Sequence, residues 1–86
     1  MQYKLEFLPI AAKQLRKLPP NIQQQLAEVI EELKINPYPV GCKKLTGIAG
    51  WRIRSGNYRV IYKTQDNLLL IVVLSLGHRK DIYRLF

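Results

Sequence analysis

The sequence is poor in cysteine and histidine, and this scarcity excludes two kinds of site. Cys42 is the only cysteine and His78 the only histidine among the 86 residues. An intrachain disulfide therefore cannot form, which fits a reducing compartment. A zinc site of three or four cysteine and histidine ligands cannot be assembled within one such chain. We accordingly expect no metal and no cofactor.

Long hydrophobic runs are also missing. The longest apolar run is LLLIVVL, residues 68–74, whereas a membrane helix needs about 20 predominantly apolar residues. The N-terminal residues lack the continuous apolar stretch of a signal peptide. We expect a soluble, cytoplasmic protein that does not act at a membrane.

Acidic residues are few. Six Asp and Glu oppose 14 Lys and Arg, which gives a formal net charge of +8. Residues 1–43 carry six basic and four acidic side chains, and residues 44–86 carry eight basic and two acidic ones. A positive field attracts polyanions, so nucleic acid, an anionic membrane and an acidic protein are the natural partners. Charge alone does not choose among the three.

The pattern of apolar residues predicts a single α+β domain, residues 1–86. Residues 2–8 alternate with the period of a strand, and residues 9–18 have helical spacing that the Pro19-Pro20 pair ends. Asn21 is a candidate N-cap for a second helix, whose apolar stripe ends at Leu33. After an irregular connector over residues 35–44, three strands follow at residues 50–54, 58–63 and 68–75. The order β-α-α-β-β-β predicts a helical hairpin packed on a small, mainly antiparallel twisted sheet.

The segment WRIRSGNYRVIYK, residues 51–63, mixes basic and apolar side chains in a regular way. Gly56-Asn57 suits a two-residue type II′ turn, because glycine can adopt the positive φ that its first position requires. This turn pairs Arg54 with Arg59 and sorts the hairpin into two faces. The apolar face holds Trp51, Ile53, Tyr58, Val60 and Tyr62, and the other face holds Arg52, Arg54, Arg59 and Lys63.

The predicted pair of Arg54 and Arg59 is unfavourable in isolation. Like charges directly opposite each other across two strands destabilise a sheet by some tenths of a kcal/mol. An anion between the two guanidinium groups would offset this repulsion, and the planar guanidinium matches phosphate or carboxylate in two-point contacts. The hairpin therefore indicates an anion-binding site. The alternative is a merely solvated face of a basic protein.

A second basic segment, residues 75–86, follows the last predicted strand. It contains His78, Arg79, Lys80, Tyr83 and Arg84. Histidine has the only side chain whose unperturbed pKa lies near neutrality, so His78 is a candidate acid or base. The alternatives are a loop histidine without a function and, for Tyr83, a packing residue beside its apolar neighbours. Gly77 prevents the alternation from assigning His78 or Arg79 to a face.

Two stretches of the sequence carry a resemblance to a known family. WRIRSGNYRVIYK resembles the basic hairpin of the RelE/ParE superfamily of toxins from type II toxin-antitoxin pairs, with its G-x-Y-R-V/L-x-Y core. LGHRKDIYR, residues 76–84, is similar to the G-x-R-x-x-x-Y tail of that superfamily. The resemblance spans nearly the whole chain, includes the two-helix insertion after the first strand, and favours the RelE branch.

The resemblance implies a ribonuclease that cuts mRNA in the ribosomal A site without a metal. The 2′-hydroxyl beside the scissile bond would attack the phosphorus, which requires stabilisation of the phosphorane charge and proton transfers at two oxygens. Catalysis would involve Arg54, Arg59, Arg79 and Tyr83, with His78 as a weaker candidate. Phosphate binding would involve Arg52, Arg54, Arg59, Lys63, Lys80 and Arg84.

One departure from the RelE pattern affects the chemistry. RelE-type enzymes can carry lysines at the positions of Arg52 and Arg54, and one such lysine has been assigned as the general base. Arginine has a pKa above about 12 and is a poor base. We therefore interpret Arg52, Arg54 and Arg59 as phosphate clamps. Arg79 would protonate or shield the leaving oxygen, and Tyr83 would orient the 2′-hydroxyl or stack on a base.

The resemblance also implies partners and leaves two rival functions open. The partners would be a RelB-like protein antitoxin, the ribosome and mRNA. One rival is a non-catalytic inhibitor of DNA gyrase, as in the ParE branch. The other is a simple nucleic-acid-binding module, whose basic face grips phosphates without chemistry.

Overall fold

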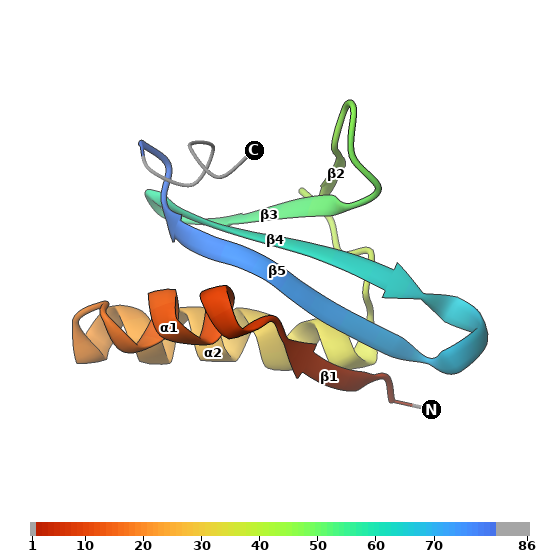
Figure 1. The fold of residues 1–86 in the computed structure, drawn as a ribbon, viewed down its shortest axis with the longest axis horizontal. Coiled ribbons are helices and arrows are strands. Elements are labelled where there is room, and N and C mark those ends of the chain that lie inside the picture. Colours follow the sequence, from red (N-terminus) through yellow and green to blue (C-terminus); the bar gives the residue numbers. More distant parts are fainter. Residues whose placement is uncertain (1, 81–86) are drawn as a thin grey trace.

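A computed structural model describes residues 2–80, and it confirms the predicted fold class. Two helices pack on one mixed five-stranded sheet (Figure 1). The elements are β1 (Lys4–Phe7), α1 (Pro9–Arg16), α2 (Pro20–Ile35), β2 (Lys43–Lys44), β3 (Trp51–Ser55), β4 (Tyr58–Gln65), the 3₁₀ turn η1 (Asp66–Leu68) and β5 (Leu70–His78). The sequence did not predict β2, which lies in the stretch interpreted as an irregular connector. Within residues 2–80, neither helix is long and apolar enough to span a membrane.

The strand order places the N-terminal strand beside the last one. The order across the sheet is β1-β5-β4-β3-β2, in which β1 pairs parallel with β5 and all other pairs are antiparallel. Figure 1 shows α1 and α2 on one face of the sheet, and β2 with the loop after it rising on the opposite side. Neither helix of residues 2–80 therefore packs on the other face of β3 and β4.

The helices bury the stripe that their spacing predicts, but α2 begins differently. Its N-cap position is Pro19, no side chain caps it, and Pro20 is already helical. Asn21 therefore lies inside the first turn, and its predicted role as the N-cap is wrong. Proline fits this start because its fixed φ and missing N–H suit the first helical residue.

The core lies between the helical stripe and the inward faces of β3, β4 and β5. Leu26 and Leu33 of α2 are fully buried there, as are Val60 and Val73 of the sheet. Tyr62 also lies in this core and donates a hydrogen bond from its hydroxyl to the carbonyl oxygen of Pro37, at 2.6 Å. This bond fixes the start of the connector against the centre of the sheet.

A cluster around Asp66 holds the rest of the connector in place. The Tyr38 hydroxyl lies 2.9 Å and 2.8 Å from the two carboxylate oxygens of Asp66, and the Tyr3 hydroxyl donates to the same carboxylate at 2.9 Å. The Tyr38 hydroxyl also lies 2.8 Å from Thr64 Oγ1, and its ring packs edge-on against Trp51 at 5.0 Å. These contacts guide the chain to the position where β2 pairs with β3.

Replacing Tyr62 with Phe should reduce the free energy of unfolding by about 1 kcal/mol at pH 7, because the buried hydrogen bond to Pro37 is lost. Burial raises the pKa of Tyr62 above the usual 10.0 of tyrosine. The unfolded chain releases this proton near pH 10 while the folded protein retains it, so the contribution of Tyr62 shrinks at higher pH.

Urea unfolding of both proteins between pH 7 and pH 11 measures this effect. The stability difference between wild type and Tyr62→Phe should be constant below about pH 9 and should narrow above pH 10. A difference that stays constant or grows in the alkaline range would contradict this account.

Candidate nucleic-acid interface

The register of the β3–β4 hairpin is the one that the turn predicts. Trp51 pairs with Tyr62, Ile53 with Val60 and Ser55 with Tyr58. Arg54 pairs with Arg59, and Arg52 pairs with Ile61. Since paired residues share a face, Arg52, Arg54 and Arg59 lie together on the side of the sheet away from the helices.

The turn itself has the expected geometry. Gly56 has a φ of +60°, and Asn57 does not have a positive φ, as a type II′ turn requires. Gln25 of α2 donates hydrogen bonds from Nε2 to the carbonyl oxygen and the hydroxyl of Ser55, at 3.1 Å and 2.9 Å. The turn is therefore tied to the helical layer, which fixes the end of the hairpin nearest to Arg54 and Arg59.

We call the basic side chains on the side of the sheet away from the helices the basic face: Arg52, Arg54, Arg59, Lys63 and, from β2, Lys43. Arg54 is exposed, whereas Arg52, Arg59 and Lys63 are half-buried. The Nε atom of Arg52 and the Nε and Nη1 atoms of Arg59 are buried. Parts of two guanidinium groups thus lie where the effective dielectric constant is below that of water, which strengthens attraction to an anion.

The basic face also contains apolar residues. Ile61 shares the face of its partner Arg52, and Val72 shares that of its partner Lys63, yet both are buried and neither belongs to the core beneath the helices. A β-bulge follows Ile61, where the register of β4 against β5 shifts. Buried apolar side chains therefore lie beside Arg52 and Lys63, so the division of the hairpin into a wholly apolar and a wholly basic face was too simple.

Lys43 is a basic-face residue that the sequence pattern did not predict. It pairs with Arg52 across the two-residue strand β2, and Lys44 pairs with Trp51. A strand of two residues is too short to show the alternation of apolar and polar residues that identifies a strand, and proline, glycine and cysteine precede this one. Its pairing depends on the tertiary contacts of the connector, so no local signal could have revealed it.

His78, one of the predicted tail residues, does not lie on the basic face. His78 pairs with Tyr58, and the two rings meet edge to face at 5.5 Å, so His78 lies on the helix side of the sheet. Its Nδ1 accepts a hydrogen bond from the backbone N–H of Lys80 at 3.2 Å. His78 therefore does not lie with Arg54 and Arg59, and its role as acid or base stays a hypothesis that this arrangement does not favour.

Arg79 lies at the turn end of the hairpin. Its backbone N–H donates to the carbonyl oxygen of Asn57 at 2.8 Å, which extends the β4–β5 ladder by one residue. Gly77 pairs with Arg59, and a Cβ at Gly77 would have no neighbour within 4 Å among residues 2–80. Arg79 and Lys80 are exposed, and the predicted residues Tyr83 and Arg84 lie outside the described part of the chain.

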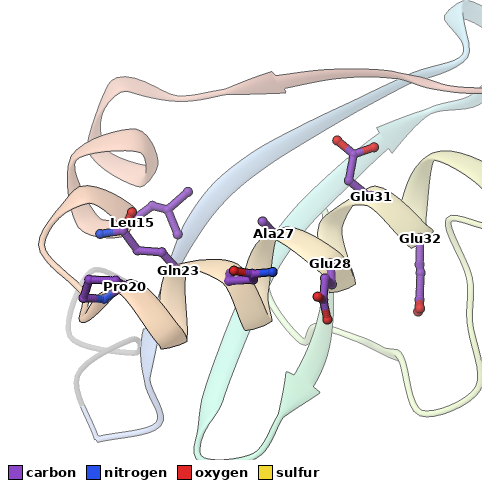
Figure 2. Close-up of a pocket in the computed structure, with 8 residues that line it drawn as sticks. Leu15, Pro20, Gln23, Ala27, Glu28, Glu31 and Glu32 are labelled. Carbon is purple, nitrogen blue, oxygen red and sulfur yellow. The ribbon is translucent and has the colours of Figure 1, made fainter.

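A groove on the helical layer has the opposite character. Figure 2 shows it along α2 near the α1–α2 junction, with Glu28, Glu31 and Glu32 among its lining residues. The other lining residues are Leu15, Pro20, Gln23, Gln24 and Ala27. Carboxylates repel phosphate, so the groove does not suit nucleic acid. The basic face is the candidate interface.

Comparison with known proteins gives consistent results. Residues 5–83 match the family of the ParE toxin of the type II toxin-antitoxin system parDE. The chain is 38% identical to the toxin RelG of Mycobacterium tuberculosis, over 98% of this chain and 99% of RelG. It is 31% identical to the mRNA interferase toxin RelE of Escherichia coli strain K12, over 93% of this chain and 86% of that toxin.

Solved structures agree with these relatives. The structure of the toxin-antitoxin complex RelBE2 from Mycobacterium tuberculosis contains a similar chain, with a TM-score of 0.83 and 30% identity, over 94% of this chain and 95% of that one. The intact RelBE toxin-antitoxin complex of Escherichia coli gives a TM-score of 0.77 and 32% identity, over 88% and 95%. Residues 5–83, which match the ParE toxin family, include the whole β3–β4 hairpin. The chain belongs to the RelE/ParE superfamily of type II toxin-antitoxin toxins and is a RelE-like member of it.

Proposed function

We propose that this toxin is a ribosome-dependent endoribonuclease that cuts mRNA in the A site without a metal. The observation that supports this proposal most strongly is the cross-strand pair of Arg54 and Arg59 on the face that the helices leave open. A relative that is 31% identical over most of its length is named an mRNA interferase. Two guanidinium groups facing one side of a hairpin supply the charge that cleavage at a phosphate needs.

The proposed reaction is an in-line transfer at phosphorus. The 2′-oxygen forms a bond to phosphorus as its proton leaves, and the bond from phosphorus to the 5′-oxygen breaks as that oxygen gains a proton. The products are a 2′,3′-cyclic phosphate and a 5′-hydroxyl. Arg54 and Arg59 stabilise the charge on the non-bridging oxygens, each contributing about 3 kcal/mol if they act like other preorganised donors. Arg79, at the turn end of the hairpin, protonates or shields the leaving oxygen.

Arg54 and Arg59 are poorly suited to transfer protons. Arginine is a poor base at neutral pH, and His78 lies on the other side of the sheet. Most of the rate must then come from holding the RNA in the in-line geometry, which can contribute about 7 to 11 kcal/mol. We propose that the ribosome supplies this positioning and that Tyr83 orients the 2′-hydroxyl or stacks on a base.

A protein antitoxin similar to RelB is the proposed inhibitor, and the cytoplasm is the proposed site of action. Related toxins have been solved in RelBE toxin-antitoxin complexes from Mycobacterium tuberculosis and Escherichia coli. An acidic or amphipathic helix that covers Arg52, Arg54 and Arg59 would offset part of the net charge of +8. Such a segment would also close the proposed RNA site.

A second candidate function is inhibition of DNA gyrase without catalysis, as in the ParE branch. The observation that favours it is the match of residues 5–83 to the ParE family. The purified protein separates the two functions: loss of DNA supercoiling with intact mRNA would favour gyrase inhibition, and cut mRNA with normal supercoiling would favour the endoribonuclease.

Replacing Arg54 with Gln should reduce cleavage of ribosome-bound mRNA by about 10²-fold to 10³-fold, because one donor to the phosphorane is lost. The same change should leave the free energy of unfolding unchanged or raise it by some tenths of a kcal/mol, because the repulsion with Arg59 is relieved. Single-turnover cleavage and urea unfolding measure the two effects. Lys13→Gln, which removes an exposed charge on α1, is the control and should change neither by much. A cleavage loss accompanied by unfolding would contradict the proposed role.

Wild-type protein should cut mRNA on programmed ribosomes at least about 10²-fold faster than the same RNA free in solution, because the ribosome provides the in-line geometry. Arg79→Ala and Tyr83→Phe should slow cleavage on ribosomes and leave cosedimentation with ribosomes intact. Equal rates on free and ribosome-bound RNA would refute the ribosome dependence. A strong loss of cosedimentation would instead make these two residues binding anchors.

A further inference from the structure

We propose that Lys43 and Arg52 form a second phosphate subsite, which binds the backbone of single-stranded RNA one nucleotide away from the phosphate held by Arg54 and Arg59. This inference rests on the proposed function, because it extends the RNA path from the proposed cleavage site. It assigns a role to Lys43, which neither the sequence pattern nor the family motifs singled out.

The pairing of β2 with β3 places Lys43 in this subsite. Lys43 is the direct cross-strand partner of Arg52, and Lys44 is the partner of Trp51. Direct partners share a face of the sheet and neighbours along a strand do not. Lys43 therefore lies on the basic face, while Lys44 lies on the face of Trp51, although the two lysines are adjacent and both exposed.

The spacing of the two basic pairs suits consecutive phosphates. Arg52 and Arg54 are two residues apart on β3, which separates their Cα atoms by about 6.5 to 7 Å. Neighbouring phosphates of an extended RNA strand lie at a similar separation. One phosphate between Arg54 and Arg59 and the next between Lys43 and Arg52 would lie about 8 Å apart at the level of the backbone, because the second pair is also displaced by one strand spacing of about 4.8 Å. The long basic side chains can reach inward to span this difference.

The Lys43–Arg52 pair and the Arg54–Arg59 pair have the same electrostatic arrangement. Two like charges face each other directly in both cross-strand pairs, and an anion between them would offset a repulsion of some tenths of a kcal/mol. Among the strand residues that the structure describes, the only acidic one is Glu6, on β1, which is separated from β3 by β5 and β4. The described strands beside Lys43 and Arg52 therefore carry no acidic side chain that would repel a phosphate.

The neighbours of the two pairs give the path a direction. The partner of Arg52 on β4 is Ile61, which is apolar and fully buried. Arg52 and Lys43 can therefore bind an anion only between β3 and β2. The pair of Arg54 and Arg59 lies between β3 and β4, and beyond Arg59 the strand β5 presents Gly77, which has no side chain. The path therefore runs obliquely, from β4 at the turn end of the hairpin toward the β2 edge of the sheet.

The position of Lys43 is fixed by contacts outside the basic face. Tyr62 and Asp66 anchor the connector that precedes β2, through the hydrogen bonds to Pro37 and Tyr38. After β2, the N–H of Leu45 donates to the carbonyl oxygen of Gly50 at 3.0 Å and closes the loop that leads into β3. Figure 1 shows this short strand beside β3, at the edge of the sheet. The two-residue strand is thus held from both of its ends.

Binding of an RNA that cannot be cut tests the subsite separately from catalysis. The probe is a short 2′-O-methyl oligoribonucleotide, and its affinity is measured by fluorescence anisotropy over a series of salt concentrations. Lys43→Gln should weaken binding severalfold and lower the slope of log affinity against log salt by about 0.7, the value for one phosphate contact on a single strand. Lys44→Gln removes the same charge one residue away and should leave the slope nearly unchanged. Equal slopes for the two variants would overturn the proposal.

A second probe locates the contact. One neutral methylphosphonate is placed at successive positions of the same oligonucleotide. At one position, the methylphosphonate should weaken binding of wild type but have little further effect on Lys43→Gln. At an adjacent position, it should weaken binding of wild type but have little further effect on Arg54→Gln. Coupling of both variants to the same position, or of Lys43→Gln to none, would contradict two separate subsites.

Two further measurements distinguish a failure of the subsite from a failure of the proposed function. Thermal unfolding of Lys43→Gln shows whether β2 pairing survives, and Lys43→Arg should restore the salt slope if a cation is what matters. Cleavage of ribosome-bound mRNA by wild-type protein tests the proposed function independently. Absence of that cleavage with an intact Lys43 effect would refute the nuclease and leave the subsite, whereas normal cleavage without a Lys43 effect would refute only the subsite.

Discussion

The register between β3 and β4 is the constraint on which the other features depend. A shift of one residue would carry every side chain of the hairpin to the opposite face. The turn at Gly56, the bonds from Gln25 to Ser55 and the burial of Ile53 and Val60 all require the same register. Burying apolar side chains on one face therefore forces Arg54 and Arg59 together on the other. The charge concentration is a consequence of how the core is packed.

Packing also offsets what the charge concentration costs. Each cross-strand pair of cations costs some tenths of a kcal/mol, whereas fully burying one large apolar side chain contributes about 1.5 to 3 kcal/mol. The sheet buries Ile61 and Val72 on the basic face in addition to the core beneath the helices. The free energy gained by burying these apolar side chains is larger than the repulsion between the guanidinium groups, so the hairpin can hold several of them close together where an anion can bind.

The sequence predicted the parts of the structure that follow from local periodicity and turn chemistry. The two helices, the hairpin register and the face of Arg52, Arg54 and Arg59 are all confirmed. The predictions failed where distant contacts decide the outcome. The strand β2 exists because the connector is tied to Tyr62 and Asp66, and α2 begins at Pro20 without the cap expected from Asn21. The bulge after Ile61 and the position of His78 beside Tyr58 likewise depend on how β5 pairs.

The central claim is that one face of this sheet holds RNA while the helical face does not. Crosslinking on ribosomes programmed with photoreactive mRNA, followed by mass spectrometry of the protein, tests it most directly. The account predicts crosslinks to peptides that contain β2, β3 and the start of β4, and none to the acidic groove of α2. Crosslinks concentrated on α1 and α2, with none on the hairpin, would contradict it.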